Sequence, residues 1–125
     1  MNKEIQRYLD KSGRALAAAE SLLADGYSSD AASKAYYAMF YAAQAALRNH
    51  GVEVIKHSAV ESFFGQHFAK TGQVDPRYHR MLIRARKLRE TADYSVEEEV
   101  SDTVAGQTLE EGKAFVAVIK AILTS

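Results

Sequence analysis

The sequence predicts an all-α fold, an antiparallel up-and-down bundle of about five helices. Apolar residues recur at helical spacing, and no segment shows the sustained period-two alternation that marks a strand. One proline, Pro76, and seven glycines leave room for long uninterrupted helices. The balance of 47% hydrophobic and 26% charged residues is typical of a globular protein, and 125 residues fit a single domain over positions 1–125.

The first two predicted helices form a long hairpin. The first covers about residues 3–24, and Gly26 ends it because glycine adopts the left-handed conformation without steric cost. The second opens at Ser28 or Ser29, whose hydroxyl is expected to cap the free backbone N–H groups. It ends before Gly51.

The next two helices are predicted from their start signals. Ser58 and Glu61 fit a capping box, which places a third helix over about residues 59–70. Asp75 is the expected N-cap of a fourth helix. Pro76 then occupies its first position, where a missing N–H costs nothing.

The fourth helix continues to Tyr94, and an acidic connection at residues 97–99 follows it. A fifth helix is predicted over about residues 101–123. Gly106 and Gly112 weaken this helix, each by ~1 kcal/mol relative to alanine at an exposed position. We therefore expect these glycines to mark close packing between helices.

Composition and charge exclude several classes of function. The formal net charge is +0, so attraction to nucleic acid or to an acidic membrane must come from local clustering. The absence of cysteine excludes a disulfide framework, a thiolate zinc site and a cysteine nucleophile. No apolar run approaches the roughly 20 residues that span a bilayer, and the N-terminus lacks a signal-peptide core. A cytoplasmic protein without membrane contact is expected.

Neither a metal nor a cofactor is expected. The histidines, at positions 50, 57, 67 and 79, include no i, i+4 pair on one helix, and no Glu-x-x-His motif occurs. The glycine-rich dinucleotide motif, the phosphate loop and the Gly-x-Ser-x-Gly nucleophile motif are also absent.

The most unusual segment is the alanine- and aromatic-rich stretch of residues 31–47. It has little polar surface, which predicts a central helix contacted on several sides. Tyr36 and Phe40 share one helical face, and Tyr37 and Tyr41 share the adjacent face. One interpretation is core and dimer packing, the usual role of rings at helical spacing. The other is that one or two tyrosine hydroxyls reach a cleft and contact a ligand or a modifying enzyme.

Positive charge gathers on the fourth predicted helix. Four of its basic residues fall at i, i+3, i+7 and i+10: Arg77, Arg80, Arg84 and Lys87. This spacing makes a basic stripe on one face, which is a candidate contact for phosphate or RNA because guanidinium groups match phosphate oxygens. The alternative is a solvated face that pairs with the eight carboxylates of residues 90–111.

Arg89 is separate from the stripe because it lies close to the apolar line of Leu82 and Ala85. Its head group is therefore expected to be half buried, and a buried guanidinium needs a carboxylate or carbonyl partner. Asp93, four residues later, is the expected partner, and Tyr94 follows it directly. A structural ion pair and a role in a site are both open.

Together these segments resemble the HEPN family of small helical domains. The similarity follows the family's order through the tyrosine segment at residues 33–43, residues 56–58 and 63–68, and residues 88–94. The final helix, around residues 114–116, fits as well, so the resemblance covers nearly the whole chain. The tyrosine segment combined with the Arg-x-x-x-Asp-Tyr segment is fairly specific.

The resemblance implies an up-and-down bundle, commonly a homodimer, often partnered with a minimal nucleotidyltransferase in a toxin–antitoxin or two-component nucleotide-binding system. Many family members are metal-independent ribonucleases whose motif is an arginine followed, after four to six residues, by a histidine. No arginine of this sequence has a histidine at that spacing. Catalytic residues are therefore unassigned, and a pair formed by folding, such as Arg89 with His57, is left open.

The leading hypothesis is a HEPN-type nucleotide- or RNA-binding subunit, the dimeric partner of a minimal nucleotidyltransferase. In it Arg89 neutralises a phosphate, Asp93 orients Arg89, and a tyrosine stacks or donates a hydrogen bond. The alternatives are a metal-independent RNA endonuclease and a purely structural helical dimerisation module. The residues expected to bind the ligand are Tyr36, Tyr37, His57, Arg89, Asp93 and Tyr94.

Overall fold

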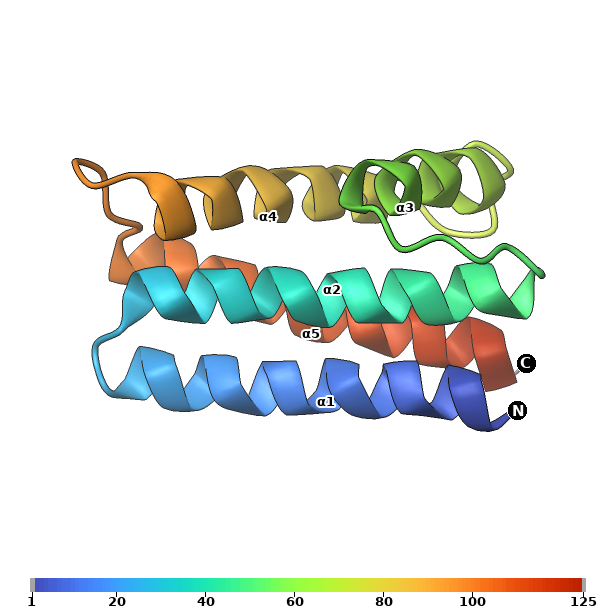
Figure 1. The fold of residues 1–125 in the computed structure, drawn as a ribbon, viewed down its shortest axis with the longest axis horizontal. Coiled ribbons are helices and arrows are strands. Elements are labelled where there is room, and N and C mark those ends of the chain that lie inside the picture. Colours follow the sequence, from blue (N-terminus) through green and yellow to red (C-terminus); the bar gives the residue numbers. More distant parts are fainter. Residues whose placement is uncertain (1, 125) are drawn as a thin grey trace.

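The computed structural model describes residues 2–124, which form five α-helices and no strand. The helices are α1 (Lys3–Ala24), α2 (Ser28–Asn49), α3 (His57–Phe64), α4 (Pro76–Tyr94) and α5 (Asp102–Thr124), and a π-helical turn, η1 (Gly65–Ala69), continues α3. Successive long helices alternate in direction, so the two ends of the chain lie at the same end of the bundle (Figure 1). The predicted all-α bundle of about five helices is confirmed.

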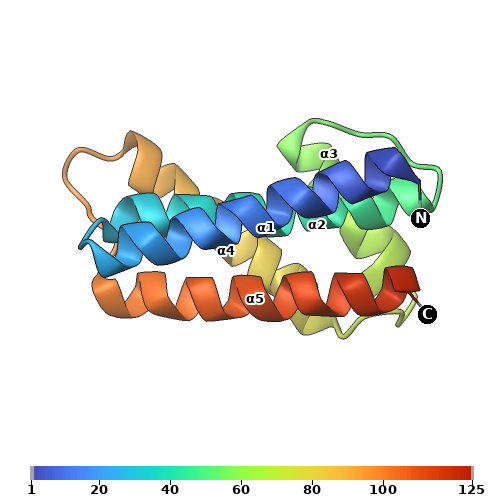
Figure 2. The same cartoon turned by 90° about the horizontal axis from the view of Figure 1, so that it is seen from below.

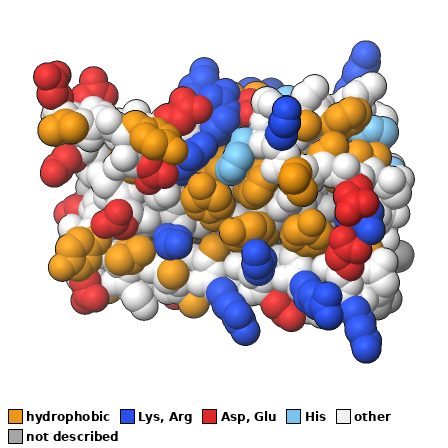
Figure 3. Space-filling view, in the orientation of Figure 1, with side chains coloured by type: hydrophobic (Ala, Val, Ile, Leu, Met, Phe, Trp, Pro, Cys, Tyr) orange, Lys and Arg blue, Asp and Glu red, His pale blue; other side chains and the backbone are white. Residues whose placement is uncertain are grey.

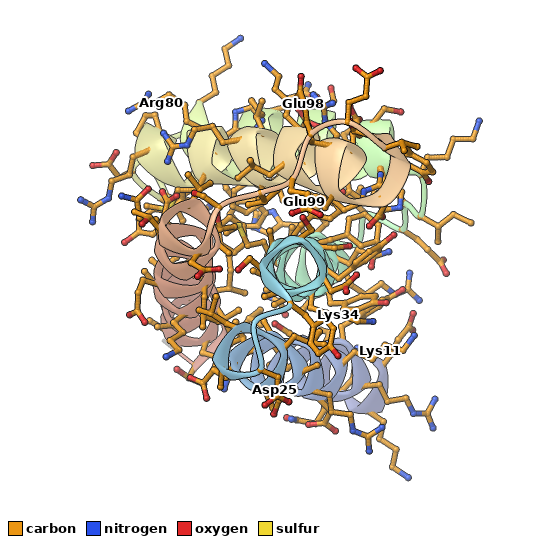
Figure 4. All side chains as sticks on the ribbon, turned by 90° about the vertical axis from the view of Figure 1, so that its left-hand side faces the viewer. Lys11, Asp25, Lys34, Arg80, Glu98 and Glu99 are labelled. Atoms are coloured by element: carbon orange, nitrogen blue, oxygen red, sulfur yellow. The ribbon has the colours of Figure 1, made fainter. Side chains whose placement is uncertain are left out.

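The central position predicted for the second helix is also confirmed. Viewed along its axis, α2 is contacted by α1, by α5 and by the layer of α3 and α4, and no helix formed by residues 2–124 covers its remaining side (Figure 4). Every alanine of α2 is fully buried, so neighbouring helices approach it closely on several faces. A buried hydrogen bond of 2.7 Å from the Ser12 hydroxyl to the Ala38 carbonyl joins α1 to α2. The hairpin of α1 and α2 and the adjacent α5 are seen from below in Figure 2.

Gly112 marks close packing between helices, as predicted. A Cβ atom at this position would lie 3.3 Å from a methyl group of Leu16 and 3.5 Å from the carbonyl oxygen of Ala35. The missing side chain therefore lets α5 approach both α1 and α2. Around Gly106 the packing is looser, since a Cβ there would lie 3.9 Å from Leu23.

The cap predicted at the start of α2 is wrong. Tyr27 occupies the N-cap position and makes no side-chain capping bond. The Ser28 hydroxyl instead donates to the carboxylate of Asp102, and the Ser29 hydroxyl accepts a 3.0 Å hydrogen bond from the backbone N–H of Val100. Both serines thus tie the start of α2 to the segment that leads into α5.

The capping box predicted for the third helix is wrong as well. This helix begins at His57, with Lys56 as its N-cap and no side-chain capping bond. Instead of one regular helix to residue 70, the chain forms α3 and then the π-helical turn η1. The cap predicted for α4 is confirmed, because the Asp75 carboxylate accepts a 2.9 Å hydrogen bond from the backbone N–H of Arg77.

Gly65 makes room for a histidine of α4. The Nε2 atom of His79 lies 2.9 Å from the carbonyl oxygen of Glu61 and must donate the proton, because a carbonyl only accepts. A Cβ atom on Gly65 would lie 2.5 Å from the His79 ring. Close contact between η1 and α4 therefore depends on the absence of a side chain at position 65.

Replacing Gly65 with alanine is expected to lower the free energy of unfolding by about 1–3 kcal/mol through this clash. In a His79→Ala background the same change should cost much less, since the obstructing ring is gone. A double-mutant cycle measured by urea unfolding tests this coupling. Gly13→Ala is the matched control: its Cβ meets nothing within 4 Å, so it should stabilise α1. Equal costs of Gly65→Ala in both backgrounds would contradict the prediction.

Candidate functional site

Side chains from three helices meet in one cluster around the tyrosine segment. Tyr36, Tyr37 and Phe40 come from α2, His57 is the first residue of α3, and Arg89 lies near the end of α4. The fold thus brings together four of the predicted site residues, which are widely separated in the sequence. Phe40 was not predicted to belong to the site.

His57 is held in place by a ring and a hydroxyl group. Its imidazole stacks on Phe40 with the ring centroids 4.2 Å apart and the planes inclined by 12°. The Nδ1 atom lies 2.5 Å from the hydroxyl oxygen of Tyr36. Within residues 2–124 this hydroxyl has no other hydrogen-bond partner, so we assign it as the donor to Nδ1. The proton of neutral His57 then lies on Nε2, the one ring nitrogen available to a ligand.

The protonation of this pair follows from its surroundings. Burial raises the pKa of Tyr36 well above its ordinary value, so its hydroxyl keeps the proton that it donates. Burial, together with the positive charge of Arg89, lowers the pKa of His57 below its ordinary value. At neutral pH His57 is therefore an uncharged imidazole that can donate a hydrogen bond through Nε2.

The guanidinium group of Arg89 lies among three tyrosine rings. Its Cζ atom is 5.5 Å from the ring centroid of Tyr36, 5.8 Å from that of Tyr37 and 5.7 Å from that of Tyr94. These distances are typical of cation–π contacts. The side chain is 11% exposed, so it is more deeply buried than the half-buried position predicted.

Polar contacts to Arg89 are weak within the described part of the chain. Its Nη1 atom lies 3.7 Å from a carboxylate oxygen of Asp93, the predicted partner, and 3.4 Å from the Tyr94 hydroxyl. Its Nε atom is fully buried and has no hydrogen-bond partner. Buried polar groups in native proteins are nearly always paired. This guanidinium therefore retains donor capacity that a ligand could use.

A pocket of about 710 Å³ opens beside His57 and Arg89. Two carboxylates line this pocket, and Arg86 pairs with both of them. Its Nε atom lies 2.6 Å from Glu61 and its Nη1 atom lies 2.9 Å from Glu90. The lining carries three cations, Lys56, Arg86 and Arg89, against two carboxylates, so one positive charge is in excess, which favours an anion. The residues lining the pocket are Lys56, His57, Ser58, Glu61, Ser62, His79, Arg86, Arg89 and Glu90.

The ion pairs at the base of this pocket were not predicted, although the sequence carried a signal for them. Arg86 precedes Arg89 by three residues, so these two arginines share a face of the fourth helix. Glu61 follows His57 by four residues, so these two share a face of the third helix. The contact between the two faces depends on how α3 packs against α4, which helical spacing does not specify.

The basic stripe of α4 does not join this site. Arg84 pairs with Glu111 on α5, and Arg77 donates to the hydroxyl of Tyr78 at 3.1 Å. Arg80 and Lys87 form no ion pair with any residue from 2 to 124, and Arg80 projects away from the bundle (Figure 4). Of the four stripe residues, Arg84 therefore pairs with a carboxylate of residues 90–111, as the alternative interpretation expected. That the stripe contacts phosphate or RNA stays a prediction.

Two further features concern metals and membranes. Among the described residues there is no group of three or more histidine, aspartate or glutamate side chains that could hold a metal ion. In the same part of the chain, no helix combines the length and apolar character needed to cross a membrane.

The lowered pKa of His57 predicts a pH-dependent contribution to stability. Because folding favours its neutral form, this contribution is fully present above the ordinary histidine pKa of 6.5 and is lost as the pH falls through the lower folded-state value. Between about pH 7.5 and about pH 5, wild type should therefore lose more free energy of unfolding than His57→Gln. Chemical unfolding at several pH values measures both slopes. Equal slopes in wild type and His57→Gln would refute the prediction.

The fold and this geometry define a class of protein: an all-helical domain with a polar pocket between α3 and α4, beside the tyrosine cluster of α2. The sequence profile of the HEPN domain matches residues 5–124. The chain therefore belongs to the HEPN domain family.

Relatives of the chain occur in archaea and bacteria. It is 31% identical over 123 residues to a Methanocaldococcus jannaschii protein named "Putative toxin MJ0142", covering 98% of this chain and 84% of the relative. A second protein of that organism, "Putative toxin MJ0605", is 31% identical over 98% of this chain and 91% of its own length. The "UPF0332 protein glr0978" of Gloeobacter violaceus is 38% identical over 94 residues, 75% of each chain.

Proposed function

We propose that this chain is a HEPN-type nucleotide- or RNA-binding subunit. In this proposal it is the homodimeric partner of a minimal nucleotidyltransferase in a cytoplasmic toxin–antitoxin-like system. One observation carries the ligand assignment: the Arg89 side chain is only 11% exposed, its Nε atom has no hydrogen-bond partner, and it lines a pocket with one positive charge in excess. A phosphate group supplies both the negative charge and the acceptor oxygens that this guanidinium needs.

Five of the six residues predicted to bind the ligand have a direct role in this proposal, and the sixth, Tyr36, holds His57 through its hydroxyl group. Arg89 binds a phosphate group, and Asp93 orients Arg89 from 3.7 Å. His57 donates through Nε2 to the same ligand. Tyr94 is 73% exposed at the end of α4, where its free ring face can stack on a base. Tyr37 forms the wall behind Arg89 and His57.

The names of two relatives support the toxin–antitoxin part of the proposal, since both are called putative toxins. A toxin of this kind requires a partner that controls it. A nucleotidyltransferase is the proposed partner because such an enzyme binds nucleotides, and the site of this chain has the groups that bind a phosphate beside an exposed tyrosine.

Ligand-induced stabilisation tests the binding assignment. A nucleotide or short RNA that binds only the folded chain should raise its stability by about 2.7 kcal/mol at a hundred times its Kd. Lys120→Gln, an exposed change on α5 outside the pocket, should keep this shift. Affinity purification of the tagged chain from its native host should also recover a nucleotidyltransferase. If no nucleotide or RNA shifts the melting temperature and no such enzyme is recovered, the proposal fails.

A metal-independent RNA endonuclease is the second candidate, and the proximity of His57 to Arg89 favours it. The tautomer assigned to His57 carries its proton on Nε2, so this nitrogen can donate a hydrogen bond but cannot accept a proton from the RNA. Action as a general base needs the other tautomer first. Incubating the protein with structured RNA and EDTA tests this activity. His57→Ala should abolish any cleavage, and cleavage that survives this change would exclude the mechanism.

A further inference from the structure

A second pocket, of about 650 Å³, lies between α1 and α2. It combines three cationic side chains with two tyrosine rings and has no acidic residue in its lining. The lining residues are Lys11, Arg14, Ala15, Ala18, Lys34, Tyr37 and Tyr41. Lys11 and Lys34 lie on the same side of the bundle, one on each helix, and Arg80 lies on the opposite side (Figure 4).

The positive charge of this pocket is not compensated within residues 2–124. None of Lys11, Arg14 and Lys34 forms an ion pair there, and the Nζ atom of Lys11 lies over the ring of Tyr41, 5.1 Å from its centroid. Lys113 on α5 shows the contrast, since it pairs with Glu20 at 2.6 Å and with a second carboxylate. Three uncompensated cations beside two rings form a site for a ligand that is both anionic and aromatic.

Tyr37 connects this second pocket to the pocket at Arg89. Its ring centroid lies 5.8 Å from the Arg89 Cζ atom and 5.8 Å from the His57 ring on one side. On the other side it lies 6.0 Å from the ring of Tyr41. On this face a band of hydrophobic side chains runs over α2, with lysine and arginine side chains along its lower edge over α1 (Figure 3).

We infer that the second pocket binds the neighbouring phosphate and base of the same ligand, so that the site takes a single-stranded oligonucleotide in preference to a free nucleotide. This inference rests on the proposed function, because it extends the strand whose first phosphate binds Arg89. The backbone continues across Tyr37 onto Lys11, Arg14 and Lys34, and a base stacks on Tyr41. An acidic protein segment would match the charge but would leave the tyrosine rings unused.

A double substitution that removes two positive charges from the second pocket tests the subsite. Lys11→Gln/Lys34→Gln removes two of its cations, and Lys3→Gln/Lys120→Gln removes two exposed cations elsewhere and serves as the control. The probes are a labelled single-stranded adenine hexanucleotide of RNA, followed by fluorescence anisotropy, and AMP, followed by thermal shift. The subsite variant should bind the hexanucleotide about tenfold more weakly. Its salt dependence should be shallower by about 0.7, the contribution of the one lost phosphate contact. Its AMP response should equal that of wild type.

Three outcomes would overturn the inference. In the first, both double variants lose the same affinity for the hexanucleotide, while Arg89→Met weakens it strongly; the pocket at Arg89 then binds alone and the proposed function survives. In the second, Lys11→Gln/Lys34→Gln changes the sedimentation coefficient but not RNA binding, which assigns the surface to protein contacts. In the third, neither probe binds wild-type protein, which removes the proposed function and the subsite together. A DNA hexanucleotide run in parallel shows whether the subsite distinguishes the sugar.

Discussion

Arg89→Met is expected to weaken nucleotide or RNA binding by roughly a hundredfold or more, because losing a buried charged contact costs about 3 kcal/mol. Methionine has similar length and fills the space among the three tyrosine rings, but it offers neither charge nor hydrogen-bond donors. Isothermal titration with the tightest ligand found by thermal shift measures the loss.

The same substitution should leave the fold intact. Arg89 makes two weak polar contacts, to Asp93 at 3.7 Å and to the Tyr94 hydroxyl at 3.4 Å, and leaves its buried Nε atom unpaired. Replacing a poorly paired buried charge with an apolar group is often neutral or stabilising, so the free energy of unfolding should fall by no more than about 1 kcal/mol. Lys120→Met, an exposed change on α5, is the control and should change neither quantity. Wild-type affinity in Arg89→Met would show that this arginine serves packing alone.

Tyr36→Ala is expected to lower the free energy of unfolding by about 3–5 kcal/mol, the usual cost of removing a buried aromatic ring. The side chain of Tyr36 is 2% exposed, and its ring contacts Tyr37, Phe40, His57 and Arg89. Its loss leaves a cavity at the centre of the site. Thermal and urea unfolding measure this cost.

Tyr36→Phe separates the ring from the hydroxyl. It keeps the packing and removes the donor to His57, so the expected loss of stability is only about 1 kcal/mol. Without that donor His57 is free to adopt either tautomer, which the ¹⁵N chemical shifts of its ring nitrogens would report. Nearly equal costs for the alanine and phenylalanine variants would contradict the packing role. Unchanged ¹⁵N shifts in Tyr36→Phe would contradict the tautomer assignment.

Local patterns were sufficient for the helices. Apolar spacing together with start and stop signals located the five helices, because both kinds of pattern act among neighbouring residues. Gly26 has a φ of 87° after α1, as expected of a glycine that ends a helix, and Asp75 caps α4. That the residues form a single domain remains a prediction.

Local patterns failed where a polar side chain has a distant partner. Ser28 and Ser29 were expected to cap their own helix, but they bond Asp102 and Val100, more than seventy residues away. Likewise, α3 begins at His57 and not after Ser58. A hydroxyl can cap a helix locally or join two segments, and sequence spacing does not indicate which of these the fold uses.

The sequence alone was enough to specify the class of fold, the central helix, and the adjacent faces that carry Tyr36 and Tyr37, because helical periodicity acts over a few residues. It also identified Arg89 and His57 as candidates. Their meeting around Tyr36, the unpaired Nε atom and the pairing of Glu61 with Arg86 depend on how α3 and α4 pack on α2. Contacts between helices join residues far apart in the chain, so they arise only when the whole bundle has folded.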